Sequence, residues 1–373
     1  MPRPVAVEAL KPLDLAVIVP TFKEADNVRR LIQSLERTLA DITYEIIFVD
    51  DNSPDGTADI VRSIALTNAR VRCLERLGRR GLAGASIEGI MATAAPVVVV
   101  IDGDMQHDER VIPRMLTTLQ NDKVDVVVGS RYAAGGSLGN WASDRRQISQ
   151  VATWLTQRVT GTTLSDPMSG FFMIRTATFR GLAKDLSALG FKTLLDIFAS
   201  SKRALSFREI PYEFRAREFG ESKLDSAVVL EFLELLVDKT IGRYGIPAKF
   251  VMFSLVGSLG VIVHLTVLTS FFKLGEANFQ TAQIAAVATA MTFNFFLNNY
   301  FTHYDRRLRG WGLLKGWLSF CGASSLGAIA NVGVAVYLYG STNTVWFVSA
   351  TAGILVGVVW NYAITSAFTW NRR

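Results

Sequence analysis

The stretch Val97-Val-Val-Val-Ile-Asp102-Gly-Asp104-Met-Gln106-His107 decides the fold of the N-terminal part of this 373-residue chain. Four consecutive valines and an isoleucine are typical of a strand that is buried on both faces, as strands of parallel sheets are. Two carboxylates and an amide follow at alternate positions just beyond the strand, where open α/β sheets place their ligands. Oxygen ligands of this kind suit a hard divalent cation, and such a cation suits a diphosphate. The stretch therefore predicts a metal-assisted diphosphate site, and a turn rich in Asp and Gly with no such role is the alternative.

The segments before this acidic motif alternate between strand and helix. Strands are expected over 15–20 and 44–49 and near 70–75, and helices are expected after the first two and over 82–93. This βαβ repetition predicts a doubly wound sheet with nucleotide-type ligands at the carboxyl ends of its strands. Neither a dinucleotide fingerprint nor a Walker A loop is present. Polar residues converge at the predicted strand ends, although some of them could instead cap helices: Glu24, Asp50, Asp51, Asp102, Asp104 and Gln106.

The C-terminal third of the chain is far more apolar than the rest. It contains four apolar stretches, at about 248–272, 279–302, 315–339 and 345–369. Each is long enough to cross a hydrocarbon core, which takes about 20 helical residues. The sequence therefore predicts four membrane spans, and four helices buried in a soluble bundle are the alternative.

Basic residues predict the orientation of these spans. The middle connection carries Arg306, Arg307, Arg309 and Lys315, whereas the other two connections carry almost no net positive charge. By the positive-inside rule, both termini then lie in the cytoplasm. The first residues contain no apolar signal-peptide segment, so the soluble part is expected in the cytoplasm as well.

Charge and amphipathicity indicate anionic partners. The formal net charge is +6, from 39 Lys and Arg against 33 Asp and Glu. This charge suits a membrane surface or a diphosphate substrate better than a nucleic acid. Stretches 145–161 and 226–243 have apolar residues at helical spacing together with basic residues. Each is expected either to pack on the soluble core or to dock at the membrane surface.

Seven ordered motifs resemble those of a known enzyme family. They are Val19-Pro-Thr-Phe-Lys-Glu24, Val49-Asp-Asp-Asn-Ser-Pro-Asp-Gly-Thr57, Asp102-Gly-Asp-Met-Gln-His107, Gly129-Ser-Arg-Tyr132, Asp166-Pro-Met-Ser-Gly170, Gly190-Phe-Lys192 and Arg217-Glu-Phe-Gly-Glu-Ser-Lys223. Over about residues 14–240 the chain resembles the GT-A family 2 glycosyltransferases, and most of all the polyprenol-phosphate (dolichol-phosphate) mannosyltransferases. Its tail is similar to four-helix GtrA-type membrane domains. The resemblance implies a Rossmann-like, doubly wound GT-A domain over 1–225, a juxtamembrane amphipathic helix and linker over 226–246, and a four-helix transmembrane domain over 247–373.

The resemblance also implies roles for individual residues. The guanosine part of a nucleotide sugar would be held by Pro20, Phe22, Glu24, Val49 and Asp51. Mg²⁺ or Mn²⁺ would be bound against the diphosphate by Asp102, Asp104 and Gln106. The donor phosphates would be flanked by Lys192 and Arg217, and the lipid phosphate would be received by Arg131, Arg145 and Ser149. Asp104 and Arg131 would be the catalytic residues.

Two positions depart from the family's usual motifs. The chain has Lys23 where the family often has Asn, and Gly103 where the acidic motif commonly has Ala. The second departure leaves the predicted metal ligands intact.

The implied activity is inverting transfer of mannose from GDP-mannose to a membrane-embedded polyprenyl or dolichyl phosphate. A phosphate acceptor is already an anion near pH 7, so its attack needs no strong protein base. The site needs cations instead, because acceptor and donor repel each other. The Gly-rich segment 133–144 is expected to be a mobile acceptor loop. Three alternatives are a UDP-glucose-dependent enzyme, a lipid-linked sugar flippase or channel, and a processive polysaccharide synthase, which the lack of a Gln-x-x-Arg-Trp motif disfavours.

Overall fold

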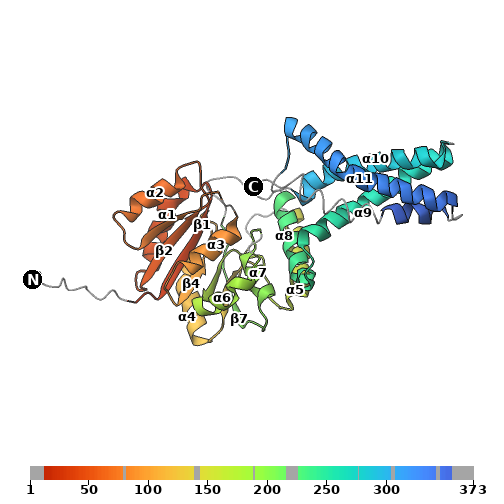
Figure 1. Cartoon of the computed structure of the whole chain (residues 1–373). Coiled ribbons are helices and arrows are strands. Elements are labelled where there is room, and N and C mark those ends of the chain that lie inside the picture. Colours follow the sequence, from red (N-terminus) through yellow and green to blue (C-terminus); the bar gives the residue numbers. More distant parts are fainter. Residues whose placement is uncertain are drawn as a thin grey trace, which may run out of the picture. The chain divides into compact units, whose positions relative to one another are not determined.

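The structure is a computed structural model that describes residues 12–78, 81–137, 143–187, 190–215, 226–275, 277–303, 307–341 and 345–354. The chain divides into two compact units, Met1–Thr240 and Ile241–Arg373. The first unit contains a sheet covered by helices, and the second consists of long helices (Figure 1).

The first unit is built on a seven-stranded sheet of order β3-β2-β1-β4-β6-β5-β7. The strands are β1 (Leu15–Thr21), β2 (Tyr44–Asp50), β3 (Val71–Glu75), β4 (Val97–Val100), β5 (Val126–Ser130), β6 (Phe172–Arg175) and β7 (Phe207–Pro211). All neighbouring strands are parallel except β6, which runs antiparallel to both β4 and β5. The expected doubly wound arrangement holds for β1 to β4 and is wrong at β6. β6 is antiparallel because the chain enters it from the edge of the sheet at which β5 ends, and at that edge Asp166, before β6, contacts Arg131, after β5.

Helices cover both faces of this sheet, as the alternation in β1 requires. Val17 and Val19 belong to one apolar core and Ile18 to the other, because successive side chains of a strand point to opposite faces. The first core includes residues of α1 (Ala25–Thr38), α2 (Thr57–Ala65) and α4 (Ile112–Asn121). The second includes residues of α3 (Leu82–Met91), α6 (Thr176–Leu182) and α7 (Thr193–Ser200). All four residues of β4 are buried, as predicted for a strand covered on both faces.

The two amphipathic stretches form α5 (Ser143–Thr160) and α8 (Ser226–Thr240). Leu155 of α5 packs in a small cluster with Phe232 and Leu235 of α8. Val151, one turn before Leu155, and Trp154 each remain 58% exposed. Packing on the first unit therefore covers only part of the apolar stripe of α5 and leaves its edge uncovered within this unit.

The second unit contains α9 (Ala248–Thr269), α10 (Phe279–Leu297) and α11 (Trp311–Ser341). Both α9 and α10 end in a π-helical turn, η4 (Ser270–Leu274) and η5 (Asn298–Thr302). Among the described residues, two helices are long and apolar enough to cross a membrane, Ala248–Lys273 and Trp311–Gly340. The third predicted span thus begins earlier than expected, and most of the fourth lies outside the described residues.

Close packing and one buried polar pair join the helices of the second unit. Gly260 of α9 lies against Asn294 of α10, where a Cβ would come within 2.1 Å of the amide oxygen. Gln283 of α10 donates to Asn331 of α11 at 3.0 Å. Small residues and side-chain hydrogen bonds of this kind are the usual means of joining helices within a membrane.

Candidate active site

The carboxyl ends of β1 and β4 form the centre of the site. β1 lies between β2 and β4, and its pairing with β4 stops at Ile18 while its pairing with β2 continues to Thr21. From β1 the chain moves along the sheet to β2, and from β4 it moves in the other direction to β5. Open α/β sheets bind ligands in the crevice at such a change of strand order.

Backbone strain is concentrated at the same edge. Lys23, Asn52 and Met105 have φ values of 60°, 54° and 63°, and they lie in the loops after β1, β2 and β4. Positive φ is uncommon for residues other than glycine, and it is found disproportionately at functional sites. The other such residue among those described, Lys123 (φ 53°), lies between α4 and β5.

The loops after β1 and β2 are joined by hydrogen bonds. The main-chain N–H of Lys23 donates to Ser53 Oγ at 2.9 Å, and that of Glu24 donates to Thr57 Oγ1 at 3.0 Å. Asp50 is fully buried and accepts from Thr21 Oγ1 and from Ser53, so its role is to hold these loops. Glu24 precedes α1 and accepts from Asn27 Nδ2 at 2.8 Å.

Asp51 is held by a buried arginine that the sequence patterns did not indicate. Its Oδ1 accepts from Arg76 Nη1 at 2.5 Å, and its Oδ2 accepts from the main-chain N–H of Gly81 at 2.7 Å. Arg76 is 5% exposed and also pairs with Glu88 at 3.3 Å. A Cβ at Gly84 would lie 2.5 Å from Arg76 Nη2, so the lack of a side chain at Gly84 makes room for the arginine.

The other expected nucleotide-binding residues differ in accessibility. Pro20 and Val49 are paired in the β1–β2 register, and Val49 is fully buried in the core beneath α3. A ligand at this edge would therefore meet the main chain of Val49 rather than its side chain. Phe22 is half-buried, with Lys23 Nζ 5.6 Å from the centre of its ring.

The acidic motif packs against the end of β1. A Cβ at Gly103 would lie 3.1 Å from Thr21 Cγ2 and 3.5 Å from Glu24 Cγ. The Asp102 side chain is 31% exposed, so a ligand can reach it. Burial raises the pKa of Asp102, whereas His107, Lys192 and Arg131 oppose this increase by their charge.

The donor set of the acidic motif fits Mg²⁺ or Mn²⁺. Asp102 Oδ1 is buried and has no hydrogen-bond partner among the described residues, and Asp104 is 7% exposed. The Gln106 amide donates through Nε2 to the carbonyl of Arg215 at 3.0 Å, which fixes the amide group. No group of three or more His, Cys, Asp or Glu suited to a metal occurs among the described residues. Two carboxylates with one amide suit a cation that completes its coordination with phosphate oxygens and water, as Mg²⁺ commonly does.

His107 contacts the acidic motif and is itself held by aromatic side chains. Its Nδ1 accepts from the main-chain N–H of Asp102 at 3.2 Å, and its Nε2 lies 3.7 Å from Asp102 Oδ2. The ring is 4% exposed and stacks on Phe171, with centroids 5.2 Å apart and an interplanar angle of 16°. Tyr212 and Phe214 contact it edge-on. The aromatic contacts leave this histidine fixed in place.

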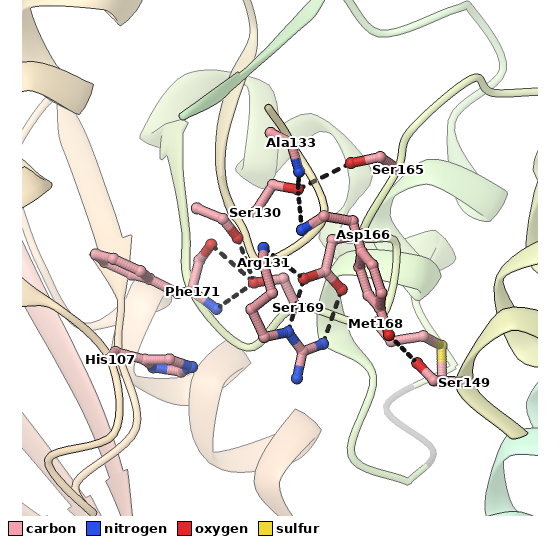
Figure 2. A network of polar contacts seen from close by, with 12 residues as sticks. His107, Ser130, Arg131, Ala133, Ser149, Ser165, Asp166, Met168, Ser169 and Phe171 are labelled. Carbon is pink, nitrogen blue, oxygen red and sulfur yellow. Dashed lines mark hydrogen bonds and ion pairs between the residues drawn. The ribbon is translucent and has the colours of Figure 1, made fainter. Parts of the chain in front are cut away.

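Arg131 and Asp166 connect two of the sequence motifs (Figure 2). Arg131 Nε lies 2.8 Å from Asp166 Oδ2, and Nη2 lies 2.8 Å from Oδ1. The arginine and aspartate side chains are 10% and 1% exposed. Burial alone would lower the pKa of Arg131, but the hydrogen bonds and charge of Asp166 raise it above its usual range, so Arg131 stays cationic.

Hydroxyl groups extend this network on both sides of the ion pair (Figure 2). Ser130 Oγ lies 2.8 Å from Ser165 Oγ, and Ser169 Oγ donates to the Gly129 carbonyl at 2.7 Å. Tyr132 donates its hydroxyl proton to Ser149 Oγ at 2.8 Å, which brings this expected acceptor residue close to Arg131.

Lys192 and Gly170 complete the described part of the site. Lys192 Nζ donates to the Met168 carbonyl at 3.3 Å, within the Asp166–Gly170 loop. A Cβ at Gly170 would lie 3.0 Å from Asp102 Oδ2, so this loop passes directly beside the acidic motif. The structure thus brings together the acidic motif, Arg131 and Lys192 at one edge of the sheet.

Some expected residues contribute no described side chain. Arg145 lies on α5, but its side chain is not among those described, and Arg217 lies outside the described residues. In the expected acceptor loop, Ser137 is held by hydrogen bonds to Tyr212 and Phe214, and residues 138–142 lie outside the described residues. The expected mobility of this loop remains a prediction.

Comparison with known proteins agrees with the class that the fold and site define. Residues 16–182 match glycosyl transferase family 2, and residues 252–370 match the GtrA/DPMS transmembrane domain. The chain is therefore a membrane-associated α/β glycosyltransferase in its domain composition. In crystal structures, glucosyl-3-phosphoglycerate synthase from Mycobacterium tuberculosis aligns with a TM-score of 0.49 at 18% identity, over 63% of this chain and 81% of that one.

Curated relatives narrow the class. The dolichol-phosphate mannosyltransferase of Pyrococcus furiosus is 31% identical over 96% of this chain and 99% of its own length. That of Mycosarcoma maydis is 36% identical over 64% of this chain and 83% of its own length. The chain belongs to the family of the dolichol-phosphate mannosyltransferases.

Proposed function

We propose that this protein transfers mannose from GDP-mannose to a membrane-embedded polyprenyl or dolichyl phosphate, with inversion at the anomeric carbon. The match with the Pyrococcus furiosus dolichol-phosphate mannosyltransferase, which runs over almost the whole of both chains, is the observation that carries the proposal. The site supports it, because oxygen ligands for a cation and two cationic side chains lie at one edge of the sheet.

On this proposal the nucleotide lies across the ends of β1 and β2. The Asp51 carboxylate accepts base N–H groups, because its two oxygens have acceptor capacity beyond the bonds from Arg76 and Gly81. Glu24 and Phe22 lie beside it on the first loop. Lys192 faces the donor phosphates, together with Arg217.

The acidic motif holds Mg²⁺ or Mn²⁺ through Asp102, Asp104 and Gln106. When bound, the cation supplies compensation for charge on the departing nucleoside diphosphate. His107 keeps Asp102 in place through the hydrogen bond that its Nδ1 accepts from the main chain, with its Nε2 3.7 Å from Asp102 Oδ2.

Arg131 receives the acceptor phosphate, with Arg145 and Ser149 nearby on α5. Asp166 orients its guanidinium by a bidentate contact and keeps it charged. The acceptor phosphate, already an anion, attacks without a protein base, so the protein's task is to offset repulsion between two anions and to align them.

The proposed organisation is a GT-A domain over 1–225, a juxtamembrane segment over 226–246 and four spans over 247–373, with both termini in the cytoplasm. Two helices of sufficient length and the match to a transmembrane domain support a membrane location. The basic connection around Arg307 and Arg309 supports the orientation.

The test is transfer of radiolabelled sugar from GDP-mannose or UDP-glucose to a polyprenyl phosphate, using purified full-length protein with Mn²⁺, Mg²⁺ or EDTA. We expect a lipid-linked product from GDP-mannose that EDTA abolishes and either cation restores. Transfer from UDP-glucose alone would overturn the assigned donor. The absence of product from either donor, while nucleotide still binds, would overturn the proposed activity.

A further inference from the structure

A pocket lies in the second unit, where α10 ends and α11 begins. Its volume is about 370 Å³, and it is lined by Phe296, Asn299, Tyr300, residues 307–310 and Leu313. This volume falls within the range of small-molecule sites, roughly 300–1,000 Å³. Neither the acidic motif nor the proposed acceptor residues contribute to it.

The frame of this pocket is fixed by one asparagine. The main-chain N–H of Leu308 donates to Asn299 Oδ1 at 2.8 Å, and Asn299 Nδ2 donates back to the Leu308 carbonyl at 3.2 Å. Asn299 belongs to the π-helical turn η5, a feature that is often found at functional sites. The paired bonds hold the segment that carries Arg307 and Arg309 beside the end of α10.

The two arginines give the pocket its chemistry. Both are exposed, and the Arg307 guanidinium lies 4.2 Å from the centre of the Tyr300 ring. Among the described residues, no carboxylate forms an ion pair with either of them. A planar guanidinium binds phosphate oxygens in pairs, so the expected ligand carries a phosphate.

The surroundings of the pocket indicate a lipid rather than a soluble anion. Trp311 is 80% exposed beside it, and Phe296 on its wall is 50% exposed. Aromatic and basic side chains together are typical of the level of the lipid headgroups, and basic pockets between membrane helices bind anionic headgroups. The pocket has no carboxylate among its lining residues, so it is suited to binding and not to metal-assisted chemistry.

We infer that this pocket binds the phosphate headgroup of an anionic membrane phospholipid, with the guanidinium groups of Arg307 and Arg309 on the phosphate and Phe296 and Leu313 against the first carbons of the lipid. This binding is independent of the sugar donor and acceptor. It attaches the hairpin of α10 and α11 to an anionic leaflet.

The experiment measures binding of phosphatidylglycerol to the full chain in an uncharged detergent, by native mass spectrometry and by thermophoresis. Replacing both arginines, as R307Q/R309Q, should weaken binding about 30-fold. Each basic residue near a membrane surface contributes roughly a fivefold factor, and two such factors multiply. Lys273→Gln is the matched control, because Lys273 also lies over an aromatic ring, at 5.4 Å from the centre of Phe272, but lines no part of this pocket. That variant should bind as tightly as the parent chain.

Further binding measurements identify the ligand. Phosphatidylcholine with the same acyl chains should bind more weakly than phosphatidylglycerol, and high salt should weaken phosphatidylglycerol binding. Equal binding by the parent and R307Q/R309Q, or equal binding of the two phospholipids, overturns the inference. A polyprenyl monophosphate that displaces phosphatidylglycerol completely at equal concentration, or inorganic phosphate that does so at millimolar concentration, overturns the assignment to a phospholipid.

A charge-conserving variant keeps the test decisive if the glutamine variant folds poorly. R307K/R309K retains both positive charges, so it should unfold at the parent's temperature and keep phosphatidylglycerol binding within a few fold. Loss of binding by this well-folded variant would show that the paired guanidinium contacts, and not charge alone, bind the phosphate. R307K/R309K should transfer mannose from GDP-mannose to a short-chain polyprenyl phosphate in detergent at the parent's rate. This result separates the inference from the proposed function.

Discussion

The guanidinium of Arg131 and the carboxylate of Asp166 form a two-point ion pair between residues 35 positions apart, with both N–O distances at 2.8 Å. This pair joins the end of β5 to the loop before β6, and it fixes the cation that is proposed to receive the acceptor phosphate. The same contact therefore joins two strand ends and holds a site residue in position.

Replacing Asp166 should damage both stability and acceptor use. Asp166→Asn leaves a buried arginine without its counter-charge, and breaking a buried pair costs about 3–5 kcal/mol. We expect a lower unfolding temperature and a higher acceptor KM. Asp122→Asn is the control, because its partner Arg208 is 61% exposed, and a surface pair contributes about 1 kcal/mol or less.

A double-mutant cycle tests the pairing itself. R131Q/D166N should be less destabilised than the sum of its two single variants, since neither buried charge is then left alone. Strict additivity of the unfolding free energies would refute a direct coupling.

Arg76 should affect donor binding through Asp51. Arg76→Gln removes the charged group that holds Asp51 Oδ1, so the carboxylate loses its fixed position. We expect the KM for GDP-mannose to rise about tenfold, equivalent to about 1.4 kcal/mol, with a smaller change in kcat. Arg72→Gln, on the same strand, is the comparison, because the Arg72 side chain is 44% exposed and pairs with Glu45 instead. Equal kinetic effects of both substitutions would rule out the positioning role.

Lys23→Asn should stabilise the protein. Lys23 adopts φ 60°, a conformation that costs most residues about 1–2 kcal/mol and that asparagine tolerates better. Lys123, with φ 53°, lies away from the site, so Lys123→Asn should stabilise similarly and leave donor kinetics unchanged. Chemical denaturation of both variants, followed by donor KM, separates backbone strain from any effect at the site. A destabilised Lys23→Asn would mean that the lysine side chain contributes more than its strain costs.

Removal of the cation site should abolish transfer. Metal-ion stabilisation of developing charge contributes several kcal/mol, and each 1.36 kcal/mol changes a rate tenfold. Asp104→Ala should therefore lower kcat at least about 100-fold. Calorimetric titration should find Mn²⁺ binding to the parent chain with nucleotide and much weaker binding to Asp104→Ala. Full activity of this variant would exclude Asp104 from the site.

Acid should destabilise the first unit partly through Asp125. Hydrogen bonds from Arg203 foremost, opposed by burial and aided by Ser206, hold the pKa of Asp125 well below its usual range. A depressed folded-state pKa contributes stability that is present above the unfolded value, about 3.9, and is lost as the pH falls toward the folded value. Asp125→Asn should thus be less stable than the parent at pH 6 and should lose less stability between pH 5 and pH 3. Parallel loss in both proteins over that interval would contradict this role.

Features that depend on local patterns could be predicted from the sequence. The run of apolar residues over 97–101 predicted a strand buried on both faces, and the alternate polar residues after it predicted the acidic edge of the site. The first of the long apolar stretches likewise predicted α9. The third stretch predicted α11, which begins earlier than expected. These features follow from side-chain period and length, which are properties of a few neighbouring residues.

The pairing of residues far apart in the chain could be learned only from the folded molecule. No local pattern pairs Arg131 with Asp166, Arg76 with Asp51, or the glycine at 260 with Asn294. The antiparallel course of β6 between β4 and β5 was likewise visible only in the folded sheet. The physical reason is that an ion pair or a close packing contact depends on where whole strands and helices lie, whereas the sequence pattern within one element specifies only its own conformation and buried face.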